Sequence, residues 1–303
     1  MDLPTIAQYR TQSRTVYVCP TCNRNLADGT CGDCGFTVDL SDEIPSFFSG
    51  SELANRYREI ARFYDSEYQS DEHVVWAPMR GPEFIAYVES LVRHTNPTRY
   101  LDIGCGQGRL LGAISALEKH GIDISPRAVA AARLRAGGSA LCLGIVEELP
   151  YPANYFDVVT GIGVMHHFLD GPAAMHEVWR VLREGGTFIV NPYIATPLFE
   201  RFLIKISEFI YPRFRPVRLS QWAFGKYRRA PALEAQKVQP VYNPYTARQV
   251  RRFFRRSGFR VTSLITKRGM PDAPLAAHHF RIYVLQKTLS GGTCRRKEAG
   301  RLP

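Results

Sequence analysis

The sequence predicts an α/β protein whose core is a doubly wound, mostly parallel β-sheet. From Tyr100 onward, short apolar segments rich in strand-forming residues alternate with longer segments of helical periodicity. This alternation is typical of a parallel sheet whose two faces are covered by helices. The first apolar segment also runs directly into a glycine-rich turn, GCGQG, at residues 104–108. A glycine turn after a first strand is typical of folds that bind a nucleotide-like ligand there.

Seven strands account for the apolar segments. They are expected at Tyr100–Ile103, Gly121–Ile124, Ala140–Leu143, Phe156–Thr160, Thr187–Asn191, Phe259–Thr266 and His279–Gln286. Helices are expected to begin near Gly108, Ser125 and Gly171, and a further helix is expected over Thr246–Ser257. Ser125 followed by Pro126 is a favourable pair of N-cap and first-turn residues.

The basic residues are concentrated in one region of the 303-residue chain, whose formal net charge is +11. Residues 201–260 contain 15 Lys and Arg but only 2 Asp and Glu, whereas residues 1–200 are net acidic. This indicates an anionic partner, such as nucleic acid, a phosphorylated substrate or an acidic membrane surface; a merely solvated face is the alternative. No apolar run reaches the roughly 18 residues of a membrane-spanning helix, and the N-terminus lacks the apolar core of a secretory signal. A cytoplasmic protein is therefore expected.

Four cysteines near the N-terminus form a metal-binding pattern. The spacing C-x2-C-x8-C-x2-C is formed by Cys19, Cys22, Cys31 and Cys34. Two such pairs place four thiolates around one tetrahedral ion; Zn2+ is expected, and iron is the lesser alternative. Four protein ligands close the site, so a structural role is expected. We assign residues 15–48 to a zinc ribbon, with a hairpin tip at Asp28-Gly29.

Two acidic residues accompany the glycine turn. Asp102 stands at the end of the first strand, and Asp123 ends the second strand, fifteen residues after Gly108. Gly104 and Gly106 allow the backbone to approach a ligand closely. A carboxylate at position 123 can accept hydrogen bonds from both hydroxyls of a ribose, so a nucleoside-containing ligand is indicated.

Five motifs follow one another in the order LDIGCGQGRLL, GIDISPRAVAAAR, VEELPYPANYFDVV, VMHHF and LREGGTFIV. Together they resemble the motifs of class I S-adenosylmethionine-dependent methyltransferases, most closely the type 11 group. The resemblance implies a Rossmann-like methyltransferase fold of seven strands with the last strand antiparallel, which we assign to residues 99–288. The N-terminal segment resembles the zinc ribbons that are fused ahead of some of these enzymes.

The resemblance implies that several residues bind S-adenosyl-L-methionine. Asp102 would help hold the methionine end, where the backbone of Gly104 and Gly106 packs against the cofactor. Asp123 would bind the ribose. Gly161, at the end of the fourth strand, would line the methionine side.

The adenine end departs from the family in one respect. Ile124 matches an apolar residue beside the adenine, but Ile145 stands where the family often has an acid near the adenine amino group. Val146 offers a backbone N–H, and Glu147 is the candidate substitute for the missing acid. The alternative is that Glu147 and Glu148 are surface charges that open a loop.

His166 and His167 follow the fourth strand, which places them over the cleft in this fold. A histidine there can act as a general base, because its ordinary pKa lies near working pH. The alternative is a structural role. Methyl transfer from an activated sulfonium can draw much of its rate from alignment and desolvation instead of a strong base.

Three further regions complete the organisation. Residues 51–98 are expected to form a helical N-terminal cap, and residues 289–303 a disordered tail. Residues 193–243 interrupt the alternation of strands and helices, and they are expected to form a basic and aromatic lid insertion.

The sequence therefore predicts a methyltransferase that acts on a small or lipid-like acceptor, with peripheral membrane contact through residues 197–229. The alternative is an RNA base methyltransferase, for rRNA or tRNA, in which the ribbon and the basic insertion hold RNA. A non-enzymatic partner subunit is a third interpretation, which the intact glycine turn and Asp123 disfavour.

Overall fold

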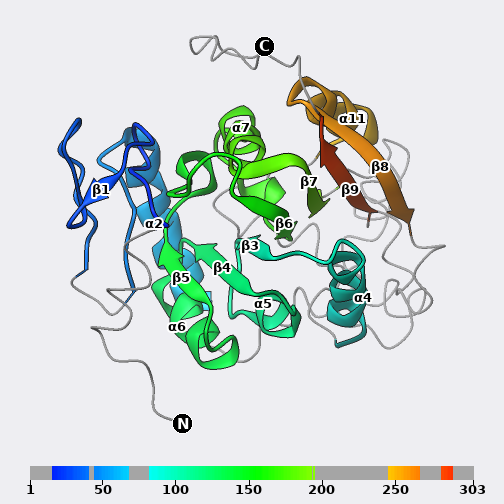
Figure 1. The fold of residues 1–303 in the computed structure, drawn as a ribbon, viewed down its shortest axis with the longest axis horizontal. Coiled ribbons are helices and arrows are strands. Elements are labelled where there is room, and N and C mark those ends of the chain that lie inside the picture. The colour runs from blue at the N-terminus through cyan, green and yellow to red at the C-terminus, as the bar shows by residue number, and fades with distance from the viewer. Residues whose placement is uncertain are drawn as a thin grey trace, which may run out of the picture.

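The computed structural model describes residues 16–40, 44–67, 82–192, 194, 245–266 and 281–288. Its centre is a seven-stranded sheet with the strand order β5-β4-β3-β6-β7-β9-β8 (Figure 1). The strands are β3 (Arg99–Ile103), β4 (Glu118–Asp123), β5 (Ala140–Leu143), β6 (Phe156–Ile162), β7 (Leu182–Asn191), β8 (Phe259–Thr266) and β9 (Arg281–Lys287). Strand β9 runs antiparallel to both of its neighbours, and all other neighbouring strands run parallel. The expected fold class is confirmed, including the antiparallel last strand.

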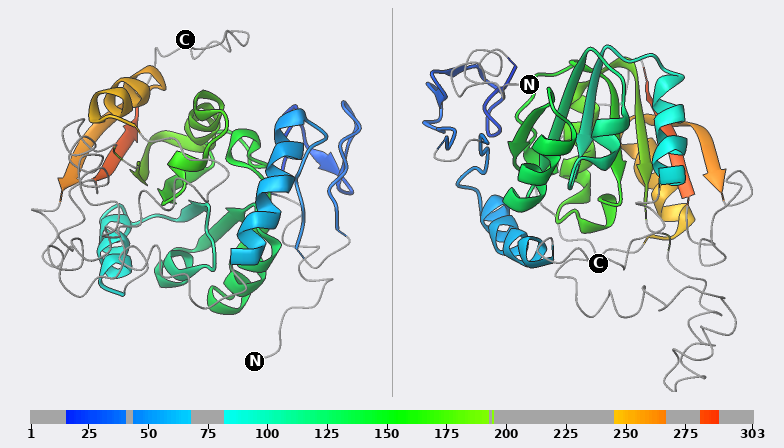
Figure 2. Two further views of the ribbon diagram at one scale, coloured as in Figure 1. Left: turned by 180° about the vertical axis from the view of Figure 1, so that it is seen from behind. Right: turned by 90° about the horizontal axis from the view of Figure 1, so that it is seen from below.

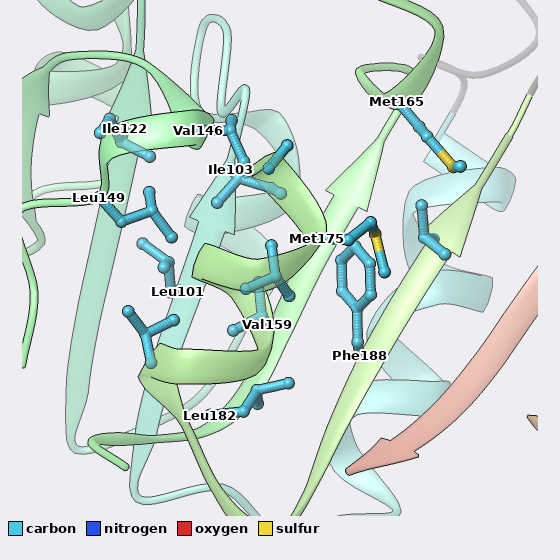
Figure 3. Packing of buried hydrophobic residues seen from close by; sticks show 14 of the residues in the cluster. Leu101, Ile103, Ile122, Val146, Leu149, Val159, Met165, Met175, Leu182 and Phe188 are labelled. Atoms are coloured by element: carbon cyan, nitrogen blue, oxygen red, sulfur yellow. The ribbon is translucent and has the colours of Figure 1, made fainter. Parts of the chain in front are cut away.

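Helices pack on both faces of the sheet, because successive strand residues point to opposite sides. Tyr100 lies in one apolar cluster and Leu101 in the other. The first cluster contains residues of α4 (Pro82–Arg93), α5 (Arg109–Ala113) and α6 (Pro126–Arg135); the second contains residues of α7 (Gly171–Val181) and α11 (Ala247–Arg256). In the second cluster, Met175 of α7 lies beside the ring of Phe188 of β7 (Figure 3).

Two strands begin earlier than their apolar residues indicate. Strand β4 begins at Glu118 and not at Gly121, and β7 begins at Leu182 and not at Thr187. In β4, His120 is only 1% exposed, and its Nε2 lies 2.7 Å from Oε1 of Glu118. The polar start of β4 is tolerated inside the sheet because Nε2 of His120 is paired with Glu118 and its ring packs against Tyr151 and Phe156.

Helices start where they were predicted, and three of these starts have side-chain capping contacts, at Ser125, Asp170 and Thr246. Ser125 Oγ accepts a hydrogen bond from the backbone N–H of Ala128, and Pro126 occupies the first turn of α6. Thr246 and Gln249 form a reciprocal capping box at the start of α11. Each contact satisfies a backbone donor that the helix itself leaves unpaired.

The N-terminal segment forms a small ribbon. Its strands β1 (Leu26–Ala27) and β2 (Thr30–Cys31) pair as an antiparallel hairpin. Asp28 and Gly29 at its tip have φ angles of 50° and 83°, so the expected turn is confirmed. Figures 1 and 2 show this ribbon at one end of the molecule beside α2 (Glu52–Glu67), whereas α11 and β8 lie at the other end.

Part of the predicted organisation lies outside the described residues. Of the insertion predicted at 193–243, only Ile194 is described, and it forms a bridge with Tyr245. The predicted tail at 289–303 lies outside entirely, and the predicted cap at 51–98 is described except for residues 68–81. Among the helices that are described, none has the length and apolar character needed to span a membrane.

Candidate functional site

The glycine turn after β3 is built so tightly that two of its positions admit only glycine. Gly104 and Gly108 have left-handed φ angles of 67° and 72°. A Cβ at Gly104 would lie 2.7 Å from Cγ2 of Val164, and one at Gly108 would lie 2.9 Å from Cα of Ala132. Both distances are far below van der Waals contact. The turn therefore offers bare backbone at the carboxyl end of β3.

Asp123, the last residue of β4, joins the glycine turn to the start of α6. Its Oδ2 accepts the backbone N–H of Gly106 at 2.8 Å, and its Oδ1 accepts that of Ser125 at 3.0 Å. Burial raises the pKa of Asp123, and these two N–H groups oppose the rise. Each carboxylate oxygen keeps a second lone pair, which can accept a hydrogen bond from a ligand hydroxyl.

Asp102 is a second buried carboxyl, on the neighbouring strand β3. Its Oδ1 accepts a hydrogen bond from Thr160 at 2.6 Å, and the Thr160 hydroxyl lies 2.6 Å from that of Tyr100. Burial raises the pKa of Asp102 to about 7; the charge of Asp123 adds to this rise, and the bond from Thr160 opposes it. A cationic group bound at this place would return Asp102 to its carboxylate form.

The segment after β5 closes one side of this edge. Its short 3-10 helix η2 (Val146–Glu148) follows Gly144, whose backbone N–H donates to the carbonyl of Asp123 at 3.1 Å. Val146 is buried in the core cluster. Ile124 packs with residues of α2. The hydrogen bond from Gly144 thus holds the start of this segment beside Asp123.

Glu147 is only 6% exposed, so the alternative of a surface charge is wrong. Its Oε1 accepts hydrogen bonds from the Tyr57 hydroxyl at 2.7 Å and from the backbone N–H groups of Leu169 and Asp170 at 3.0 and 3.1 Å. Burial raises the pKa of Glu147, and the bond from Tyr57 opposes the rise. Its Oε2 is buried with no hydrogen-bond partner in the described parts of the chain.

The two histidines lie in a 3-10 turn, η3 (Met165–His167), after β6. His166 is 2% exposed, and burial together with the neighbouring His167 lowers its pKa well below the ordinary value. Nδ1 of His167 lies 3.0 Å from the hydroxyl of Tyr64 on α2. Of the two, His167 is thus the better placed to exchange a proton.

Gly161 lies within β6, next to Thr160. A Cβ on Gly161 would approach side-chain atoms of Ile103 and Phe188 to 3.2 Å. On that side the strand is packed against the core, so the role of Gly161 toward the methionine end stays a prediction.

Three residues of this edge were not predicted from the sequence: Tyr57, Tyr64 and Thr160. The two tyrosines lie on α2 and contact residues that are 90 and 103 positions away, and Thr160 reaches Asp102 across 58 positions. Helical periodicity marks α2 as amphipathic, but it does not say which distant turn the helix will meet. The one sequence signal that could have identified Thr160 is that it is a polar residue inside an otherwise apolar strand.

The four cysteine sulfur atoms come together in the ribbon, where all lie within 4.8 Å of one another. Sγ of Cys19 lies 3.4 Å from that of Cys34, and Sγ of Cys22 lies 3.4 Å from that of Cys31. A tetrahedral zinc ion with bonds of about 2.3 Å would hold its sulfur ligands about 3.8 Å apart. The four thiols therefore fit one such ion with little movement.

The two cysteine pairs have the same backbone structure. In each pair, the first cysteine (Cys19 or Cys31) donates its N–H to the carbonyl five residues later and accepts the N–H from four residues later. The residue in that fourth position, Asn23 or Gly35, has a left-handed φ of 59° or 74°. Two matching loops thus direct their sulfur atoms to a common centre.

Comparison with known families matches residues 101–190 to the model of a methyltransferase domain. The chain contains a class I methyltransferase domain. The matched residues span the glycine turn, Asp123, η2 and the two histidines. The resemblance of the sequence motifs to this family is therefore confirmed.

Relatives of the methyltransferase domain have different named substrates. Demethylmenaquinone methyltransferase of Symbiobacterium thermophilum is 32% identical over 167 residues, which are 51% of this chain and 63% of the relative. A tRNA (carboxymethyluridine(34)-5-O)-methyltransferase of Macaca fascicularis is 29% identical over 158 residues, which are 48% of this chain and 22% of the relative. The methyltransferase YcgJ of Bacillus subtilis is 31% identical over 134 residues, which are 41% of this chain and 53% of YcgJ. The chain thus spans less than two thirds of each of these relatives.

Among solved structures, magnesium protoporphyrin IX methyltransferase from Synechocystis PCC 6803, with bound SAH, has the same fold as the methyltransferase domain. The TM-score is 0.52 at 14% identity, and the match covers 76% of this chain and 99% of that one. At this identity the likeness concerns the fold alone.

Proposed function

We propose that the protein is an S-adenosylmethionine-dependent methyltransferase whose acceptor is a small or lipid-like molecule. The observation that supports this most is the placement of two buried carboxyls, Asp102 and Asp123, on either side of a bare glycine turn. Asp123 accepts hydrogen bonds from the ribose hydroxyls, and Asp102 holds the cationic amino group. The backbone of Gly104 and Gly106 packs against the cofactor, which supplies an activated methyl group when bound.

At the adenine end, three residues complete the proposed site. Ile124 offers an apolar surface, and Val146 offers a backbone N–H. Oε2 of Glu147 is a buried acceptor whose partner is missing within the described residues, and an adenine amino group would supply it.

Proton removal from the acceptor is assigned to His167. Its contact with Tyr64 orients the ring. His166 stays neutral because burial lowers its pKa, and it packs against His167 with ring centroids 3.9 Å apart. The pair thus combines one buried supporting ring with one ring that can accept a proton.

A small acceptor is supported by the quinone-methylating name of one relative. The proposal extends to peripheral membrane contact through residues 197–229, where a lipid-like acceptor would be met, and to a structural Zn2+ in the four-cysteine site. We therefore also propose a cytoplasmic location at the membrane surface, where the protein would meet a lipid-like acceptor.

Calorimetry with S-adenosylmethionine tests the cofactor assignment. The wild-type chain should bind, and Asp123→Ala should weaken binding by about 100-fold, since a hydrogen-bonded charged group is lost. Cell extract incubated with methyl-labelled cofactor and the protein then shows which fraction accepts the label. We expect the label in the lipid or small-molecule fraction. If calorimetry detects no cofactor binding, the proposed function is wrong.

A second candidate, RNA base methylation, is supported by helix α11. Its exposed side carries five arginines: Arg248, Arg251, Arg252, Arg255 and Arg256. Val250 and Phe254 are buried on the opposite side. No acidic side chain in the described ranges forms an ion pair with these arginines, and like charges at i,i+4 repel one another. Phosphates would relieve that repulsion, because guanidinium groups bind them bidentately.

A further inference from the structure

Residues 143–150 form a wall beside the carboxyl end of β4. The backbone N–H of Gly144 donates to the carbonyl of Asp123 at 3.1 Å. Ile145 is buried in the same apolar cluster that Ile124 joins. The conformation of residues 143–150 therefore decides how this side of the candidate cofactor site is enclosed.

The four-cysteine ribbon, through its first residues and through residues 45–47 near its end, holds both ends of residues 143–150. At the start, the N–H of Phe47 donates to Leu143 at 2.8 Å, and the N–H of Leu143 donates to Pro45 at 2.9 Å. At the end, the N–H of Val18 donates to Pro150 at 3.0 Å. Val18 directly precedes the first cysteine of the cluster. The wall is thus tied to the ribbon at two points, one of them next to a metal ligand.

A third tie lies in the middle of the wall. The hydroxyls of Ser49 and Ser51 donate to the two carboxylate oxygens of Glu148. Ser49 is only 3% exposed, and Glu148 is the sequence neighbour of Glu147. Hydrogen bonds to a carboxylate are among the stronger ones, so this contact fixes η2 against the chain that leaves the ribbon.

Aromatic packing joins the same parts. The ring of Tyr17 is buried, with its centroid 4.6 Å from that of Phe47 and 5.5 Å from that of Tyr151. Tyr17 and Val18 lead directly into Cys19. Because metal binding orders the loops that carry the ligands, it also fixes where these two residues lie.

We propose that the metal-loaded ribbon positions residues 143–150 for cofactor binding, so that metal and S-adenosylmethionine bind cooperatively. This inference rests on the proposed function, because it places the adenine end of the cofactor at this wall. Coupling between two binding sites is reciprocal. Bound cofactor therefore also raises the affinity of the cysteines for the metal, by the same factor.

Titration of the full chain with S-adenosylhomocysteine, before and after zinc removal by a chelator, tests the coupling. We expect zinc removal to weaken binding by about tenfold or more. Hydrogen exchange should accelerate at residues 143–150 and stay unchanged in β6. Equal affinity in both forms would overturn the inference and leave the proposed function standing. If the zinc-loaded chain does not bind at all, the proposed function fails and the inference fails with it.

A variant that keeps all four cysteines, and so keeps its metal, tests the positioning of residues 143–150 separately from metal loss. Ser49→Ala removes one hydrogen bond to Glu148, and we expect about fivefold weaker cofactor binding at unchanged zinc content. Ser49→Thr keeps the hydroxyl and should restore the affinity. Ser263→Ala, on the exposed side of β8, is the matched control and should bind like wild type. Wild-type affinity in Ser49→Ala would contradict a positioning role.

Discussion

The hydroxyl of Tyr64 lies 3.0 Å from Nδ1 of His167, and the two rings meet edge to face. This contact joins helix α2 to the turn after β6. It gives the imidazole one fixed orientation over the carboxyl edge of the sheet. The proposed proton acceptor is therefore set in place by a residue of the N-terminal helix.

Replacing Tyr64 by Phe keeps the ring contact and removes the hydrogen bond to His167. We expect kcat to fall about tenfold, because a general base contributes only when it is oriented. Cofactor affinity should stay unchanged, since Tyr64 has no assigned role in cofactor binding. Steady-state kinetics with the acceptor found in the labelling experiment measures both. Tyr87→Phe, on α4, is the control, and an unaltered kcat in Tyr64→Phe would argue against His167 as the base.

Asp123→Asn should separate the structural role of this side chain, which accepts backbone N–H groups, from its proposed role in binding the ribose. The amide oxygen can still accept one backbone N–H, but the charge that would attract the two ribose hydroxyls in the proposed site is lost. We expect cofactor binding to weaken by about tenfold to 100-fold in calorimetry. Glu184→Gln, an exposed change of the same charge, should leave binding intact. Equal weakening in both variants would indicate a general effect of charge.

Cofactor affinity should depend on pH through Asp102. Burial raises its pKa to about 7 in the free protein, so below pH 7 a cationic ligand must displace a proton to bind. Affinity should therefore rise up to about tenfold per pH unit below 7 and level off above it. Calorimetry at pH 6 and 8, in buffers of different ionisation enthalpy, measures the proton release. Asp102→Asn should bind more weakly and lose this pH dependence; retention of the slope would point to another group.

The four-cysteine site should contain about one zinc ion per chain. Replacing Cys22 and Cys34 by Ser removes one sulfur from each loop, and we expect the metal content to fall to background. Elemental analysis measures this directly. Cys142→Ser changes a buried cysteine outside the cluster and should leave the zinc content unchanged. Metal retained by the double variant would exclude tetrahedral binding by these four thiolates.

The arginine side of α11 can be tested by the salt dependence of RNA binding. If Arg248, Arg252 and Arg255 contact phosphates, their replacement by Ala should lower the slope of log K against log salt by about 2 to 3. Fluorescence anisotropy with labelled tRNA over a range of salt concentrations gives that slope. Replacement of Arg56 and Arg62, on the exposed surface of α2, should change it little. Absence of binding at low salt would leave only the small-acceptor proposal.

The strands, the glycine turn and the cysteine loops could be predicted because each depends on neighbouring residues. An apolar run makes β3 or β6 recognisable, and the Asp28-Gly29 pair marks the ribbon turn. The early start of β4 could not be predicted, since the buried His120 is paired with Glu118 and packed among aromatic rings that lie far away in the sequence. A polar residue is buried only where it has suitable partners, and a search for apolar runs in the sequence does not detect such a residue.

In the candidate site, too, some residues could be predicted from the sequence and others could not. Asp102 and Asp123 could be assigned because strand ends meet at one edge of a parallel sheet. The environment of Glu147 could not, because it is created by Tyr57, a residue 90 positions away. Contacts between an N-terminal helix and distant turns depend on how whole elements pack, and no short motif encodes them.

The pairing of Ser46 with Leu143 also covers part of the outer edge of the sheet, which solvent would otherwise contact. Strand β5 is an outermost strand of the seven-stranded sheet, and its sequence ALCL is apolar. A bare apolar edge invites other chains to add to it, and proteins commonly cover such edges. Here the chain that leaves the ribbon shields the amide and carbonyl groups of Leu143. A form of the protein shortened to begin at α2 would therefore expose a site for self-association.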